Sequence, residues 1–159
     1  MSLANEAEFW RLCIQVRLEP PKAAIEWAKT MLVDLDSPPE ELEELPTLIQ
    51  DDVKGVVSCL KALSKQENIQ DVAESIYERV MIHIYQLHKE NHLTGRQAAR
   101  KLYQLCQSAS FPSTHHQDFC HMADNNFVLA EQGFRSEESA EQEMVRYLER
   151  LAAEWNPAT

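Results

Sequence analysis

Only three glycines, at positions 55, 95 and 133, occur in this chain of 159 residues. Sheet proteins of this length need many tight turns with positive φ, and glycine usually occupies those positions. A chain with so few glycines is better suited to a small number of helices with short connections. Because 44% of the residues are hydrophobic, which is typical of globular proteins and not of disordered chains, we expect a packed core.

Helical periodicity runs along the whole chain. The clearest stretch extends from Ile69 to about Glu90, where apolar residues recur at a spacing near 3.6. Thr94 and Gln97 form a capping-box pattern at the start of the next helix, and Gly133 suits the left-handed position that ends a helix. The other helices are predicted over about residues 5–16, 21–33, 50–65, 94–108, 113–132 and 136–155, with a short one between Ser37, its N-cap, and Pro46.

These elements predict an all-α fold with seven longer helices and one short helix. Their lengths are unequal and no motif repeats, which favours an irregular multi-helical array or bundle over a solenoid. The length fits one domain, so we expect residues 1–159 to form a single helical domain.

The formal net charge is −11, from 26 acidic and 15 basic residues. Such a surface repels nucleic-acid phosphates, which proteins bind mainly through lysine and arginine, and it repels anionic membranes. We therefore expect no nucleic-acid partner and no membrane association. The charge favours solubility and attraction to a basic protein partner.

The four cysteines, at positions 13, 59, 106 and 120, lie far apart and form no C-x-x-C pair. The sequence begins without the basic and apolar regions of a secretory signal, and no stretch has the roughly 18 apolar residues that span a bilayer. These features predict a cytoplasmic protein whose thiols are free and mostly buried.

Six histidines raise the possibility of metal chemistry. His88 and His92 are four residues apart, and His116 and Cys120 repeat that spacing, so two helices could bring both pairs to one zinc ion. However, Glu90 is one position too late for the H-E-x-x-H motif of zinc peptidases. A metal-binding helical enzyme built on this His/Cys cluster is thus kept as an alternative.

Sequence motifs for other chemistry are absent. The chain has no G-x-S-x-G, P-loop or G-x-G-x-x-G pattern, and its paired acids are sequence neighbours that point about 100° apart on a helix. A DNA-reading helix carrying Arg96, Arg100 and Lys101 is a weaker alternative, because nearby acids oppose it. We predict no catalytic residue, no bound metal and no cofactor, and favour a protein that is not an enzyme.

The strongest local asymmetry is an acidic segment over residues 34–52. It contains eight of the 26 acids and no lysine or arginine. A solvated helix face would explain it, but concentrated charge of one sign also steers a basic partner and accelerates association. The predicted partner-binding residues are Asp34, Asp36, Glu40, Glu41, Glu43, Glu44, Asp51 and Asp52.

Residues 9–63 resemble a family of uncharacterised bacterial domains associated with the immunity proteins of polymorphic toxin systems. The matching residues are mostly hydrophobic: Phe9-Trp10-x-Leu12, Ala24-Ile25-Glu26-Trp27-Ala28, Leu32, Leu42-x-x-Leu45 and the stretch from Val53 to Leu63. The charge and the helical pattern favour a small acidic helical module that binds protein, and the resemblance implies that this module is an immunity protein that occludes a cognate toxin. Toxins that cleave nucleic acid are basic, so the acidic segment is consistent with such a partner.

Overall fold

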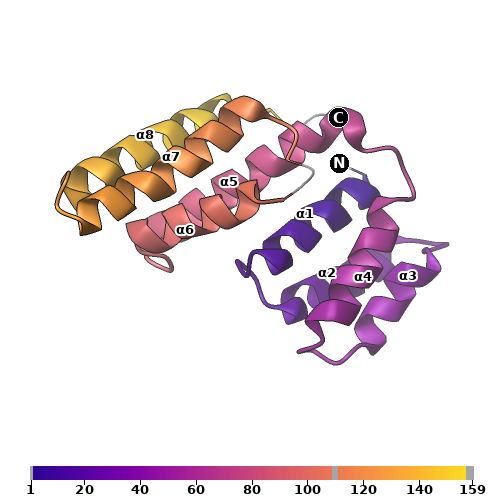
Figure 1. The fold of residues 1–159 in the computed structure, drawn as a ribbon. Helices are drawn as coiled ribbons and strands as arrows, with labels where there is room; N and C mark the ends of the chain where they lie inside the picture. The colour runs from indigo at the N-terminus through magenta and orange to yellow at the C-terminus, as the bar shows by residue number, and fades with distance from the viewer. Residues whose placement is uncertain (1, 109–110, 157–159) are drawn as a thin grey trace. The chain divides into compact units, whose positions relative to one another are not determined.

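The computed structural model describes residues 2–108 and 111–156. Within these ranges the chain forms eight α-helices and two 3-10 turns, with no β-strand (Figure 1). The predicted all-α fold, with seven longer helices and one short helix, is therefore confirmed. None of the described helices is both long enough and apolar enough to cross a membrane.

The chain divides into two compact units, one within residues 1–72 and the other within residues 73–158. Sequence analysis did not anticipate this division, and its expectation of a single domain over residues 1–159 stays a prediction. The acidic segment belongs to the first unit. All the histidines belong to the second unit.

The first unit contains four helices. Its core is formed where α1 packs against α4, where α3 packs against α2 and α4, and where the following 3-10 turn packs against α2 (Figure 1). Ile14, Ile25, Leu42 and Leu60 are among the side chains buried there. The bounds are α1 Leu3–Gln15, α2 Pro21–Asp34, α3 Glu40–Glu44, η1 Leu45–Thr47, α4 Val53–Ser64 and η2 Gln70–Val72.

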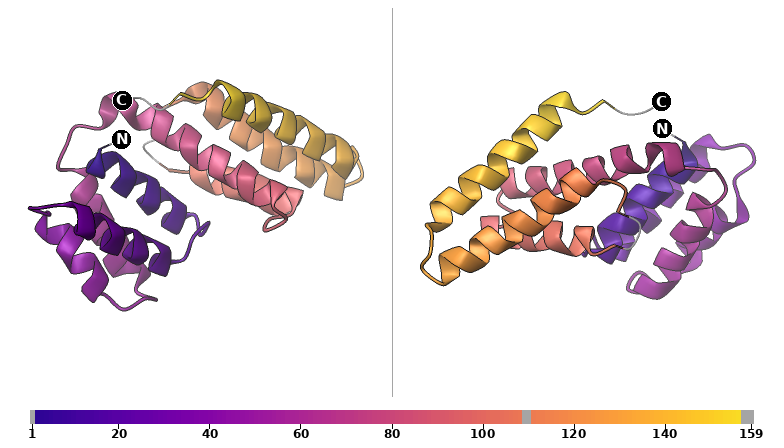
Figure 2. Two further views of the ribbon diagram at one scale, coloured as in Figure 1. Left: turned by 180° about the vertical axis from the view of Figure 1, so that it is seen from behind. Right: turned by 45° about the horizontal axis from the view of Figure 1, so that its top comes forward.

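The second unit is a four-helix bundle formed by α5 (Ala73–Lys89), α6 (Gly95–Cys106), α7 (Thr114–Glu131) and α8 (Glu137–Glu154). Helices α5 and α7 each pack against both α6 and α8, so the four helices enclose one core (Figure 2). The fully buried side chains of this core include Ile76, Ile84, Leu102, Phe127 and Leu148.

Several helix ends follow the sequence signals. The Thr94 hydroxyl accepts a hydrogen bond from the Gln97 amide and the Gln97 side chain accepts one from the Thr94 amide, which completes the predicted capping box. Ser113 and Ser136 cap α7 and α8. Gly133 has φ of 81°, as predicted for the residue that ends α7. All four cysteines are free and buried, also as predicted.

Among the helix starts that differ from the prediction, two have a clear local cause. Ser37 is not an N-cap: Pro39 occupies that position in an extended conformation and α3 begins at Glu40. A proline disfavours the helical region for the residue before it, so Pro38 and Pro39 together delay the helix. Helix α5 begins at Ala73 and not at Ile69, because the Asn68 side chain accepts from the Gln70 amide and the next residues form a 3-10 turn.

Candidate functional site

The acidic segment extends from the last residue of α2, through α3, to the start of α4. Six of its eight acids are exposed, and Glu41 and Asp52 are half-buried. These two also have structural roles: Asp52 caps α4 by accepting a hydrogen bond from the Gly55 amide at 2.9 Å, and Glu41 accepts one from the Gln66 side chain at 2.8 Å. The other six acids are therefore the stronger candidates for contact with a partner.

The acids of this segment lack basic counterparts. No lysine or arginine in the described ranges forms a salt bridge with any of the eight. Acids elsewhere do have such partners; Glu8 contacts Arg11, and Glu143 lies 3.2 Å from Arg135. The negative charge of residues 34–52 is therefore not paired with any lysine or arginine of the described ranges, and it is available to an external cation.

The effect of this charge is visible at Cys59, a buried residue of α4. Burial raises the pKa of the Cys59 thiol to about 11, and the neighbouring Glu44, Glu41 and Asp52 carboxylates add to the rise. Each of these carboxylates disfavours a thiolate at the same position. Residues from α3 and from the start of α4 thus contribute to one negative region.

Exposed apolar side chains accompany these acids. Val33 is 84% exposed just before Asp34, and Ile49 is 77% exposed just before Asp51. Val53, the first residue of α4, is also exposed. Single exposed apolar residues are common, but here Ile49 lies within the acidic segment, and Val33 and Val53 lie directly before and after it. They are candidates for the apolar anchors that a protein interface requires.

The His/Cys cluster considered from sequence does not form. Among the described residues, three metal-ligating side chains come together at one place only, and His116 is the one member of the predicted set that takes part. His88 contacts the Leu93 carbonyl and Glu141, while His92 is exposed beside Glu90. Burial raises the pKa of the Cys120 thiol well above its usual value, so that side chain is a poor thiolate ligand.

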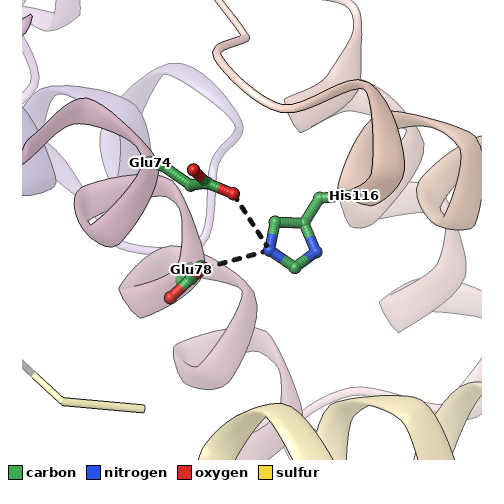
Figure 3. Close-up of side chains that lie close together, drawn as sticks. All are labelled: Glu74, Glu78 and His116. Carbon is green, nitrogen blue, oxygen red and sulfur yellow. Dashed lines mark hydrogen bonds and ion pairs between the residues drawn. The ribbon is translucent and has the colours of Figure 1, made fainter.

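Two glutamates complete the cluster around His116, and sequence analysis missed both. Glu74 and Glu78 lie one turn apart on α5 and point toward the His116 ring on α7 (Figure 3). His116 Nε2 is 3.0 Å from a Glu78 oxygen and 3.8 Å from a Glu74 oxygen. The i, i+4 spacing of the two acids was a visible signal, but only the bundle reveals which histidine faces them.

The other nitrogen of the His116 ring is also engaged. Nδ1 is 2.7 Å from the Tyr147 hydroxyl, and the Tyr147 ring stacks on Phe119 with centroids 3.7 Å apart. Burial raises the pKa of Tyr147 to about 12, with smaller contributions from Cys120, Glu78 and Glu74. The tyrosine therefore stays protonated near neutral pH and helps fix the orientation of the imidazole.

Two of the three basic residues weighed as a DNA-reading helix, Arg96 and Arg100, contact acids within the bundle. Arg96 contacts Asp124 at 2.7 Å and Glu131 at 2.6 Å, and Arg100 lies 3.6 Å from the second Asp124 oxygen. Partial burial lowers the pKa of Arg96, but these hydrogen bonds outweigh it and the net shift is upward. Both arginines thus help join α6 to α7.

Comparison with known proteins found no matching family model, no matching curated protein and no matching solved structure.

Proposed function

We propose that this chain is a small acidic helical protein-binding module that recognises a basic protein surface through residues 34–52. One observation carries the proposal: eight acids are concentrated in 19 residues, and no described lysine or arginine pairs with them. Charge that is not neutralised internally steers a partner of opposite charge and accelerates its association.

The exposed apolar residues Val33 and Ile49 would supply the contacts that hold the complex together. In protein interfaces, affinity comes mainly from a few desolvated anchors, while peripheral charges mostly set the association rate. Within this class we propose an immunity protein that blocks a cognate toxin by covering its active surface. A toxin that acts on nucleic acid would present the required basic surface.

The test begins with a basic protein that the full chain captures from its source cells, followed by measurement of association rates across a series of salt concentrations. Changing Glu40, Glu43 and Glu44 to glutamine should slow association by about 10-fold at low salt and flatten its salt dependence. The charge-matched control replaces three exposed acids outside the segment: Glu67→Gln, Asp118→Asn and Glu149→Gln.

Equal slowing by both triple variants would mean that net charge matters and the segment does not. An unchanged rate in the first variant would remove residues 34–52 as the docking surface. For the immunity function, one equivalent of the chain must also abolish the nucleic-acid cleavage of the captured partner. A partner without such activity would leave the binding function in place and refute the immunity function.

A further inference from the structure

We propose that Glu74, Glu78 and His116 form a binding site for a divalent transition-metal ion in the second unit. Each residue offers one ligand atom, and the three atoms lie within 4.8 Å of one another. This site is separate from the acidic segment, since all three residues belong to the four-helix bundle. It therefore does not depend on the binding function proposed above.

The spacing of the ligand atoms suits a metal ion. A zinc ion binds imidazole nitrogen and carboxylate oxygen at roughly 2.0–2.2 Å, so tetrahedral ligand atoms stand roughly 3.4 Å apart. The distances from His116 Nε2 to the Glu78 and Glu74 oxygens, 3.0 Å and 3.8 Å, lie on either side of that value. Small side-chain shifts would bring all three atoms to bonding distance of one ion.

The electrostatics also favour a cation at this point. Glu74 and Glu78 occupy i and i+4 on α5, where like charges repel each other, yet both carboxylates approach the same nitrogen (Figure 3). No lysine or arginine in the described part of the chain forms a salt bridge with either acid. A single imidazolium offsets only one of the two negative charges. A divalent ion offsets both.

The surroundings of His116 match the usual support of a metal ligand. Metal-bound histidines commonly use the second ring nitrogen for a hydrogen bond that holds the ring in place. Here the Tyr147 hydroxyl is 2.7 Å from Nδ1, and stacking on Phe119 restrains the tyrosine ring. When the metal occupies Nε2, Nδ1–H would donate to the Tyr147 oxygen. Tyr147 is then a positioning residue.

The site opens onto a pocket. Glu78, His116 and Tyr147 line a cavity of about 630 Å³ together with Arg150 and Trp155. Three protein ligands leave at least one position of a tetrahedral ion free, and catalytic zinc sites keep such a position for water or substrate. A metal at this point would have room for an exogenous ligand on the pocket side, which a closed structural zinc site lacks.

Zinc chloride and cobalt(II) chloride are the probes, titrated into the metal-free full chain. We expect one equivalent of zinc by calorimetry, and visible cobalt absorption of the kind given by tetrahedral coordination. Glu78→Gln and His116→Gln should each weaken zinc binding at least 10-fold. Glu74→Gln, at a more exposed position, should weaken it too with little risk to folding, which circular dichroism checks.

His92→Gln is the matched control, because His92 is an exposed histidine that also lies beside a glutamate. It should keep wild-type affinity. Tyr147→Phe should keep one equivalent and the cobalt bands while losing about 10-fold or more in affinity, which is the usual cost of removing the support of a ligating histidine. Absence of zinc binding in the wild-type chain would overturn the proposal. So would equal affinity in the wild-type, Glu74→Gln and His116→Gln proteins.

Discussion

Replacing Arg96 by methionine tests whether this residue of α6 stabilises the bundle or serves to bind an external ligand. Arg96 joins α6 to α7 through Asp124 and Glu131. Methionine keeps an unbranched apolar stem, so the change removes the charge and its hydrogen bonds with limited loss of packing. If the arginine serves the bundle, stability should fall. If it is free to bind an external ligand, stability should change little.

The magnitude follows from the two contacts. The Glu131 side chain is 58% exposed, and an exposed pair contributes about 0–1 kcal/mol. The Asp124 side chain is only 9% exposed, and a buried charge that loses its last ion-pair partner destabilises the fold by about 3–5 kcal/mol. Arg100 still lies 3.6 Å from Asp124, which reduces the penalty. We expect a loss of about 2 kcal/mol, or roughly 6 °C in Tm.

Urea unfolding followed by far-UV circular dichroism measures this loss, and a double-mutant cycle with Asp124→Asn isolates the pair. The coupling energy should be about 1–2 kcal/mol, whereas Glu131→Gln alone should cost less than about 0.5 kcal/mol. A loss below about 0.5 kcal/mol in the Arg96 variant would refute the structural role. Salt-sensitive duplex DNA binding that disappears in the same variant would revive the DNA-reading alternative.

Two further predictions concern Cys59 and Gly133. Because the folded thiol of Cys59 has its pKa raised from 9.0 to about 11, the unfolded chain loses this proton first, and the free energy of unfolding should fall as pH rises from 9 to 11. Thermal melts across that window measure the fall, which Glu44→Gln should lessen; a flat profile in the wild-type protein would contradict it. Gly133→Ala should cost about 1–2 kcal/mol in urea unfolding, because φ is 81° and no atom lies within 4 Å of an added Cβ. Gly133→Asn should cost less, and an equal cost would argue against backbone strain.

Helix positions were predictable because their signals are local. The spacing of apolar residues, the capping box at Thr94 and the turn at Gly133 each act within a few residues. The late starts of α3 and α5 are also local in origin. Pro39 and Asn68 impose backbone conformations that compete with the helix.

The candidate metal site was not predictable in the same way. Sequence analysis selected His116 and proposed His88, His92 and Cys120 as its companions, because it considered only spacing along each helix. The ligands that face His116 come from α5, 38 residues away in the case of Glu78. Whether side chains so far apart in the sequence meet depends on how the four helices pack in the bundle, and no local pattern encodes it.

Which acids pair with basic residues could not be predicted from the sequence either. This pairing determines where on the protein the net charge of −11 is felt by a partner. In the second unit, Arg96 and Arg135 lie against acids of the same unit, so their fields largely cancel beyond a Debye length of about 10 Å. Residues 34–52 have no such cancellation among the described side chains. The triple substitution within residues 34–52 and the control triple substitution outside them change the net charge equally. They should nevertheless differ in how much they slow the association of a basic partner. That difference separates a docking surface from a protein that is merely acidic.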